Sequence, residues 1–213
     1  MKTEFIIAAS HAIKQTILAN ENTLESLDRA IGDGDHYINM KRGSNAIVEM
    51  QAELEALSFN EALNKIGLKL LSTIGGASGP LLASFFMAMA KELKANGDES
   101  NFKVAAGFAS GVQAIVQRGK ANIGEKTMLD VLIPVSDQFV LLATQNRDVK
   151  SICVALILTA EQGTLATKDL IATKGRAAGL GERAIGHIDP GAKSCQLMIE
   201  AVCKLVLESE NKK

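Results

Sequence analysis

Three aspartates and a histidine lie close together in the segment L-D-R-A-I-G-D-G-D-H, residues 27–36. Asp33 and Asp35 are two positions apart, so they project to the same side of an extended loop, and Asp28 can reach the same point from a helix end. Carboxylates held this close repel each other unless a cation lies among them. All-oxygen ligands favour Mg²⁺ or Ca²⁺ over zinc. The spacing predicts a divalent-metal site, with helix capping and an Asx turn as the alternative, and His36 is a candidate phosphate donor or general base.

A second segment, G-G-A-S-G-P at residues 75–80, combines glycines with the start of a predicted helix. Glycines allow backbone N–H groups to converge on one point, and a helix N-terminus adds partial positive charge. The Ser78 hydroxyl can donate to the same anion. The segment therefore predicts a phosphate site, while an ordinary helix-to-helix turn is the alternative.

Two further loops carry basic residues. The first contains R-G-K at 118–120 and continues into G-E-K-T-M-L-D at 124–130, and the second contains K-G-R at 174–176. Lys126 is a candidate phosphate ligand or a solvated loop residue. Met128 is a candidate for contact with an adenine, or a core residue. Arg176 is suited to neutralising phosphate, because its guanidinium is planar and always charged. Asp189 precedes Pro190 and is a good helix start.

The elements that carry these loops are predicted to be helices. Only three prolines occur in 213 residues, helix-forming residues are abundant and aromatic residues make up 4%. No alternating strand pattern is present. Apolar spacing predicts helices over 3–19, from Asn22 or Thr23 to about 28, over 37–56, from Asn60 to just before 75, and over 78–96, 102–116, 128–144, 149–167 and 190–208. The fold class is all-α, and the irregular stretch 168–189 is expected to be a functional loop.

Composition excludes several classes of protein. The formal net charge of −1 argues against a nucleic-acid binder. The sequence contains no run of about 18 apolar residues, so we expect no membrane span. The N-terminus does not resemble a signal peptide, and three cysteines without a C-x-x-C pair indicate reduced thiols. We expect one domain, residues 1–213, in the cytoplasm.

Taken in order, these motifs resemble a known family. L-D-R-A-I-G-D-G-D-H-Y-I-N-M-x-R-G, G-G-A-S-G-P, R-G-K-A…G-E-K-T-M-x-D and K-G-R-A…L-G-E-R-A-I-G-H-x-D-P-G-A are similar to the nucleotide-binding L subunit of dihydroxyacetone kinase, over residues 24–200. The same module forms the C-terminal domain of single-chain, ATP-dependent dihydroxyacetone kinases. The resemblance implies an antiparallel eight-helix barrel, or bundle, whose loops at one end bind the nucleotide.

The resemblance also implies the roles of residues. Asp28, Asp33 and Asp35 would hold two Mg²⁺ ions, and with His36 they would be the catalytic residues. The nucleotide would be surrounded by His36, Tyr37, Ile38, Asn39, Ala77, Ser78, Gly79, Gly119, Thr127, Met128, Arg176, Asp189, Pro190 and Gly191. The family usually has glycine where this chain has Tyr37, and a tyrosine would be strained there if positive φ were required.

As a free-standing chain, the protein resembles the ADP-binding subunit of the phosphoenolpyruvate-dependent system. It would take a phosphoryl group from a phosphohistidine M subunit onto resident ADP and pass it to dihydroxyacetone, or a related ketose, held by a K subunit. Two alternatives stay open: a kinase subunit that exchanges ATP, and a non-catalytic nucleotide-binding regulator of a transcription factor.

Overall fold

The computed structural model describes residues 3–94 and 100–211, and within these ranges the chain forms helices and no strand. Eight long helices form a closed ring in which each packs against the next and the last packs against the first. They are α1 (Thr3–Ala19), α3 (His36–Val48), α5 (Phe59–Thr73), α6 (Ser78–Lys94), α7 (Asn101–Gly119), α8 (Leu129–Thr144), α9 (Val149–Ala166) and α10 (Pro190–Glu210). The all-α, eight-helix barrel expected from the sequence is confirmed.

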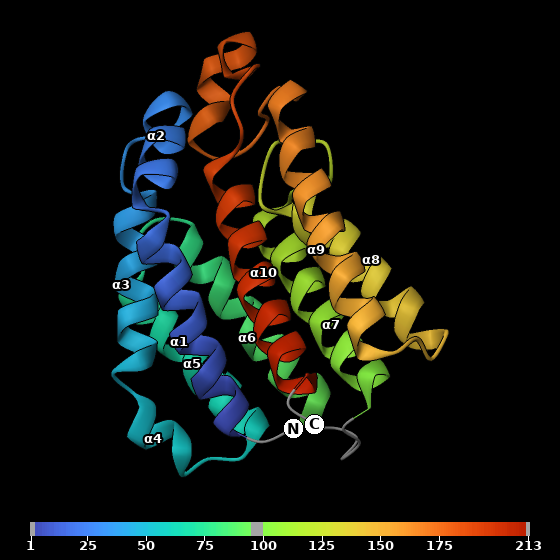
Figure 1. Ribbon diagram of the computed structural model, residues 1–213. Coiled ribbons are helices and arrows are strands. Elements are labelled where there is room, and N and C mark those ends of the chain that lie inside the picture. Colours follow the sequence, from blue (N-terminus) through green and yellow to red (C-terminus); the bar gives the residue numbers. More distant parts are fainter. Residues whose placement is uncertain (1–2, 95–99, 212–213) are drawn as a thin grey trace.

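Shorter elements lie outside the ring. They are α2 (Glu21–Ile31), α4 (Gln51–Glu55) and two 3₁₀ segments, η1 (Thr167–Asp169) and η2 (Arg176–Ala184). Successive long helices run in opposite directions, so four connections meet at the end of the barrel where α2 and η2 lie (Figure 1). These connections are residues 32–35, 74–77, 120–128 and 167–189. Every motif with predicted chemistry therefore lies at one end.

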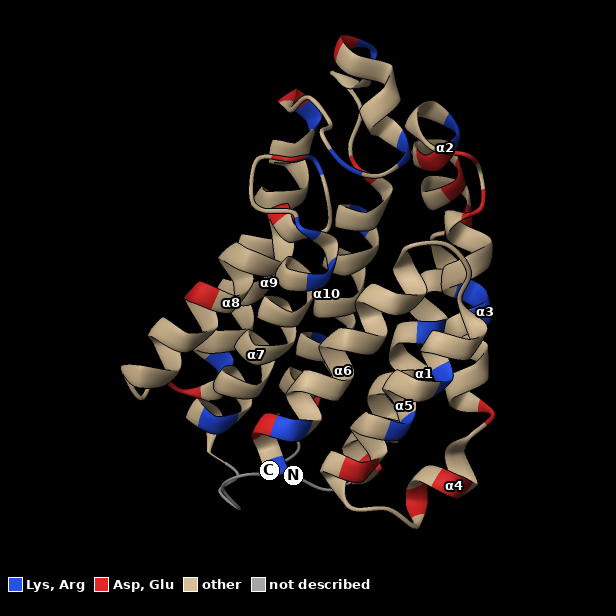
Figure 2. Cartoon of the chain, turned by 180° about the vertical axis from the view of Figure 1, so that it is seen from behind, with Lys and Arg blue, Asp and Glu red and all other residues tan. Residues whose placement is uncertain are grey.

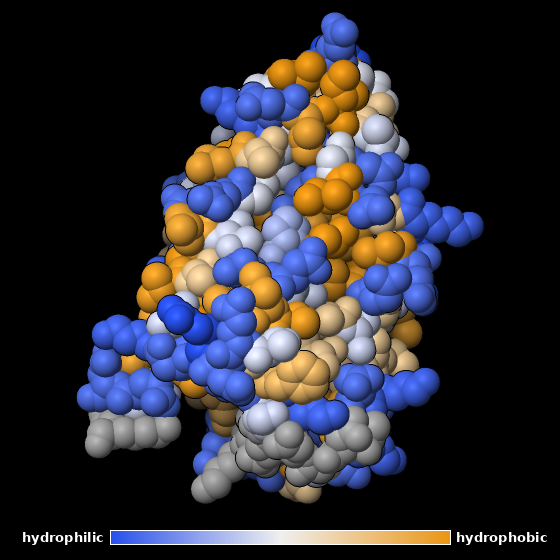
Figure 3. All heavy atoms as spheres, turned by 90° about the vertical axis from the view of Figure 1, so that its right-hand side faces the viewer, coloured by the Kyte–Doolittle hydropathy of each residue, from blue (hydrophilic) through white to orange (hydrophobic). Residues whose placement is uncertain are grey.

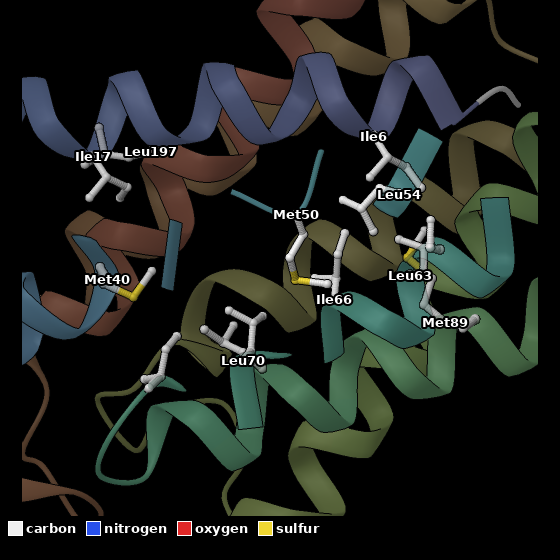
Figure 4. Packing of buried hydrophobic residues seen from close by; sticks show 14 of the residues in the cluster. Ile6, Ile17, Met40, Met50, Leu54, Leu63, Ile66, Leu70, Met89 and Leu197 are labelled. Atoms are coloured by element: carbon white, nitrogen blue, oxygen red, sulfur yellow. The ribbon is translucent and has the colours of Figure 1, made fainter. Parts of the chain in front are cut away.

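The interior of the barrel holds two large apolar clusters. One joins α1, α3, α4, α5, α6 and α10 through residues such as Ile17, Leu54 and Ile66, each at most 2% exposed (Figure 4). The other joins α7–α10 and includes Ile115 and Val135. Burying side chains of this kind contributes about 1.5–3 kcal/mol each. The two clusters make a rigid base for the loops above them.

The boundaries of some helices differ from the sequence prediction. The expected helix 37–56 is two helices, because the Met50 N–H bonds to the Ile47 carbonyl, one residue nearer than in an α-helix, and the chain turns there. The α5 helix is capped by Ser58 rather than Asn60, since Ser58 and Glu61 form a capping box. The α2 helix begins at Glu21 and extends to Ile31.

One helix among the described residues, spanning 149–169, is long and apolar enough to cross a membrane by length and composition alone. A core helix of a soluble protein passes the same test, and α9 packs against α8 and α10 in the ring. Its outer face exposes Val154, Leu158 and Leu165, and apolar patches alternate with polar ones on this side of the barrel (Figure 3). By length and composition, the expectation that the sequence has no membrane-spanning segment is therefore not confirmed.

Candidate functional site

Asp28, Asp33 and Asp35 come together where α2 ends and α3 begins. Each offers a carboxylate oxygen, and these oxygens all lie within 4.8 Å of one another. Asp28 is 4% exposed, whereas Asp33 and Asp35 face solvent. Three anionic oxygens at this separation repel each other without a cation. Their number and hardness fit Mg²⁺, which takes carboxylate and water oxygens.

The backbone of the 32–36 loop holds Asp28 in place. A Cβ on Gly32 would overlap the Asp28 carboxylate and its backbone carbonyl, so the close approach of loop and helix requires glycine there. The backbone N–H of His36 donates to Asp28 Oδ2 at 2.9 Å. One oxygen of Asp28 is thus oriented by the loop that also carries the other two carboxylates.

His36 lies on the inner side of this loop. Its Nε2 is 3.1 Å from the hydroxyl of Ser194 on α10. Since that hydroxyl donates to the Gly191 carbonyl at 3.0 Å, its oxygen is free to accept from the imidazole. Burial lowers the pKa of His36, while the neighbouring Asp28 and Asp35 carboxylates act in the opposite direction. The arrangement fixes the ring between the acidic loop and α10.

A cation reaches the acidic cluster from the η2 segment. Arg176 Nε lies 2.8 Å from Asp33 Oδ2, and its side chain is 72% exposed. The segment is anchored by a small apolar cluster in which Ala177 and Ala184 pack with Ile31 of α2. Acidic and basic side chains therefore gather at the same end of the barrel (Figure 2).

The glycine-rich segment is tied to α3 by Asn39. The Asn39 Oδ1 atom accepts a hydrogen bond from the Gly75 N–H at 3.3 Å, and the residue is 6% exposed. Gly76 has φ +64°, and a Cβ on Gly79 would overlap the Ile74 carbonyl, so this turn depends on its glycines. The N-terminus of α6, at Ser78, is thereby held beside the start of α3.

The 120–128 loop and the start of α10 form the other side of this end. A Cβ on Gly191 would lie 3.8 Å from the Cβ of Met128. Asp189 caps α10 by accepting the Ala192 N–H at 2.7 Å, and burial raises the pKa of its carboxyl to about 7. This side of the barrel end is lined by backbone atoms and by the apolar side chain of Met128. Such a lining suits a flat, uncharged group.

The chain matches the model of the DAK2 domain over residues 30–204. The chain belongs to the Dak2 family. This Dak2 chain is 40% identical over 177 residues to the ADP-binding subunit DhaL of the PEP-dependent dihydroxyacetone kinase of Escherichia coli (strain K12), which covers 83% of the chain and 84% of that subunit.

A second relative is subunit DhaL of the PEP-dependent dihydroxyacetone kinase 1 of Listeria innocua, 38% identical over 188 residues, with 88% and 89% of the two chains covered. These relatives belong to phosphotransferases, and so does the Dak2 chain. The dihydroxyacetone kinase from C. freundii, solved with AMP-PNP and Mg²⁺, has the same fold, with a TM-score of 0.73 at 23% identity over 93% of this chain and 33% of that one. The family resemblance found in the sequence is confirmed.

The structure brings most of the predicted site residues of the Dak2 chain to one end, but it gives two of them unexpected surroundings. Tyr37 lies in the first turn of α3 and is 3% exposed, packed in the core cluster that includes Leu24. Its φ is not positive, so the strain considered above is absent. The Ile38 side chain is 50% exposed. A nucleotide contact at Tyr37 would therefore come from the backbone.

The sequence did not indicate the surroundings of Asp130 and Lys126. Asp130 accepts hydrogen bonds from the Gly124 N–H at 2.5 Å and the Thr127 N–H at 2.7 Å, and so shapes the loop before α8. The pattern T-x-x-D at 127–130 is a capping-box signal that predicts the second bond. Lys126 is buried instead of solvated or free to bind phosphate. No local pattern distinguishes a buried loop lysine from an exposed one.

Proposed function

We propose that the chain is the ADP-binding subunit of a phosphoenolpyruvate-dependent dihydroxyacetone kinase in the cytoplasm. The observation that carries the proposal is the convergence of three carboxylates with the N-terminus of α6 and with Arg176, because a nucleoside diphosphate with Mg²⁺ needs all three kinds of group. The names of two relatives that match most of the chain, both ADP-binding subunits, support it.

In this function Asp28, Asp33 and Asp35 hold two Mg²⁺ ions. Bound Mg²⁺ offsets the negative charge of the phosphates and orients the transferring group. Ser78 and the backbone of 77–79 donate to phosphate oxygens, and His36 and Asn39 line the same side. Arg176 exchanges its contact with Asp33 for one with phosphate. The nucleoside lies against Gly119, Thr127, Met128, Asp189, Pro190 and Gly191.

The reaction consists of two phosphoryl transfers. The first breaks the N–P bond of a phosphohistidine on an M-type partner and forms a bond to the β-phosphate of ADP. The second breaks that new P–O bond, restoring ADP, and forms a P–O bond to a hydroxyl of dihydroxyacetone, or a related ketose, on a K-type partner. The hydroxyl proton leaves to a base. This chain positions the phosphates and supplies charge neutralisation, which dominate such reactions.

Native mass spectrometry before and after EDTA treatment tests the resident nucleotide. We expect the purified protein to carry the added mass of ADP and two Mg²⁺ ions, which EDTA removes. A protein that is empty as purified and takes up ATP on addition would be an ATP-exchanging kinase subunit. Binding of neither nucleotide would contradict the proposal and leave only the fold assignment standing.

Replacing Asp33 with Asn tests the metal assignment. The substitution removes one anionic ligand, and we expect phosphoryl transfer to fall by at least about 100-fold, because Lewis-acid stabilisation is worth several kcal/mol. The far-UV circular dichroism should be unchanged, since Asp33 faces solvent. Transfer is measured in the complete system with both partner subunits. Retained activity would contradict the assignment.

A further inference from the structure

Lys126 is buried at the end of the barrel that carries the site. The residue is 1% exposed, although lysine is rarely buried in proteins. Its Nζ donates to the carbonyl oxygens of Thr167 and His187, each at 2.5 Å. Burial opposes the charge of the ammonium and lowers the pKa of Lys126, while Asp189, Asp130 and Asp169 act in the opposite direction. The two carbonyls and these acidic groups partly offset the cost of burying the charge.

These bonds join three segments that are far apart in the sequence. Lys126 belongs to the 120–128 loop, Thr167 follows the last turn of α9, and His187 precedes α10. Met128 lies two residues after Lys126 and Gly191 lies four residues after His187, and the two approach each other closely. The ammonium therefore fixes the spacing of the two walls assigned above to the nucleoside.

The backbone of the loop directs this side chain inward. Lys126 has φ +60°, a left-handed conformation that is uncommon for a residue with a Cβ. The hydrogen bonds from Gly124 and Thr127 to Asp130 hold the loop on both sides of it. At 1% exposure the ammonium is closed off from a ligand, which excludes a direct contact with phosphate.

We propose that Lys126 is a positioning residue that holds the 120–128 loop against the start of α10 and so shapes the nucleoside half of the nucleotide site. The inference rests on the proposed function. It predicts that loss of the ammonium weakens binding of the nucleoside half of the nucleotide and leaves binding of the phosphate half unchanged. Loss of the ammonium disturbs the nucleoside walls, whereas the carboxylates of the 28–35 segment and the start of α6 are held by other contacts.

The experiment compares Mg²⁺·ADP with Mg²⁺·pyrophosphate by isothermal titration calorimetry, on the full chain freed of bound nucleotide. We expect Lys126→Met to weaken ADP binding by about tenfold or more, because two buried carbonyls lose their donor and the walls move. Pyrophosphate binding should stay within about twofold of wild type, since distant sites act independently. Lys126→Arg should bind ADP more tightly than Lys126→Met, because it keeps the charge and the donors.

Lys168→Met is the matched control. Lys168 is an exposed lysine next to Thr167, so the same substitution alters the charge at this end without touching the buried contacts. Both ligands should bind this variant within about twofold of wild type. Equal weakening of the two ligands by Lys126→Met would show a general structural role and overturn the inference, as would unchanged ADP affinity.

Circular dichroism and urea unfolding establish that each variant is folded. Should Lys126→Met not fold, Lys126→Gln makes the same comparison: ADP binding should weaken by more than about twofold, with pyrophosphate unchanged, because the shorter, uncharged side chain does not reach both carbonyls. Equal loss of both, or no loss, overturns the inference. If the wild-type protein binds neither ligand, the proposed function is overturned, and the inference with it. Failure of the proposed function is thus distinguished from failure of the inference alone, in which wild type binds both ligands.

Discussion

At the scale of single residues, Asp28 differs from the other two carboxylates of the candidate metal site because it is buried and tightly packed. The carboxylate lies directly against the Cα of Gly32, where no side chain fits. A small change beside it would therefore displace a proposed metal ligand without replacing any of the three aspartates. This makes Gly32 as informative a position as the aspartates themselves.

We expect Gly32→Ala to weaken Mg²⁺ binding in the presence of ADP by about 10- to 100-fold, as changes next to metal ligands commonly do. A Mg²⁺ titration followed by calorimetry measures it. Gly179→Ala is the matched control, because a Cβ there meets no atom within 4 Å and the residue does not have positive φ. Equal Mg²⁺ affinity in both variants would contradict the close packing.

No hydrogen bond of ordinary geometry reaches the buried hydroxyl of Tyr37 among the described residues, although the Glu21 carboxylate lies near it. An unpaired buried polar group destabilises a protein by about 1–3 kcal/mol. Tyr37→Phe should therefore leave the free energy of unfolding in urea unchanged or raise it by up to about 1 kcal/mol. Phosphoryl transfer should not change. A variant less stable than wild type would show that the hydroxyl has a partner.

Local spacing was sufficient to find the three aspartates, because their chemistry follows from residue type and separation. It was not sufficient for Lys126, whose role depends on carbonyl groups 41 and 61 positions away in the chain. Nor does spacing show that Ser194 contacts His36 across the barrel. Side chains whose partners come from distant helices require the tertiary structure.

At the scale of elements, the start of α10 combines capping with an unusual ionisation. Burial raises the pKa of Asp189 to about 7, so the folded state binds a proton that the unfolded state has lost above about pH 4. Stability from this group is therefore present at low pH and is lost as pH rises toward 7, by up to about 1.4 kcal/mol per pH unit.

Asp189→Asn removes this titration and keeps a good N-cap. We expect the stability of wild type relative to the variant to decrease between pH 5 and pH 8, measured by urea unfolding of the nucleotide-free protein. Parallel pH curves for the two proteins would show that Asp189 has an ordinary pKa. A carboxylate stabilised by an ion pair would titrate below about pH 4 instead, and would give no difference in slope between pH 5 and pH 8.

Helix periodicity predicted α1 at Thr3–Ala19 and the extents of α8 and α9 to within a residue or two. These helices have long apolar stripes, which are the strongest local signal. The break between α3 and α4 was not predicted, because the apolar pattern continues through Met50, which enters the core at the turn. The η2 segment was expected to be irregular, and its 3₁₀ turns depend on packing against α2.

At the scale of the whole molecule, the proposed nucleotide would contact loops that connect most of the ring. Binding should therefore stabilise the barrel as a unit. At a concentration of Mg²⁺·ADP about 100-fold above Kd, linkage predicts about 2.7 kcal/mol of added stability. For a chain of this size that raises Tm by about 5–10 °C. Differential scanning fluorimetry measures the shift, and EDTA should reverse it. An unchanged Tm at saturating ligand would contradict the proposed site.

The α1 helix begins and the α10 helix ends at the end of the barrel remote from the site (Figure 1). Another polypeptide can be fused at either position without its linker crossing the mouth of the nucleotide site. The same barrel therefore suits two genetic arrangements, a separate subunit that docks mouth-first and a module tethered within a longer enzyme. In the C. freundii kinase, a barrel of this fold is one third of the chain.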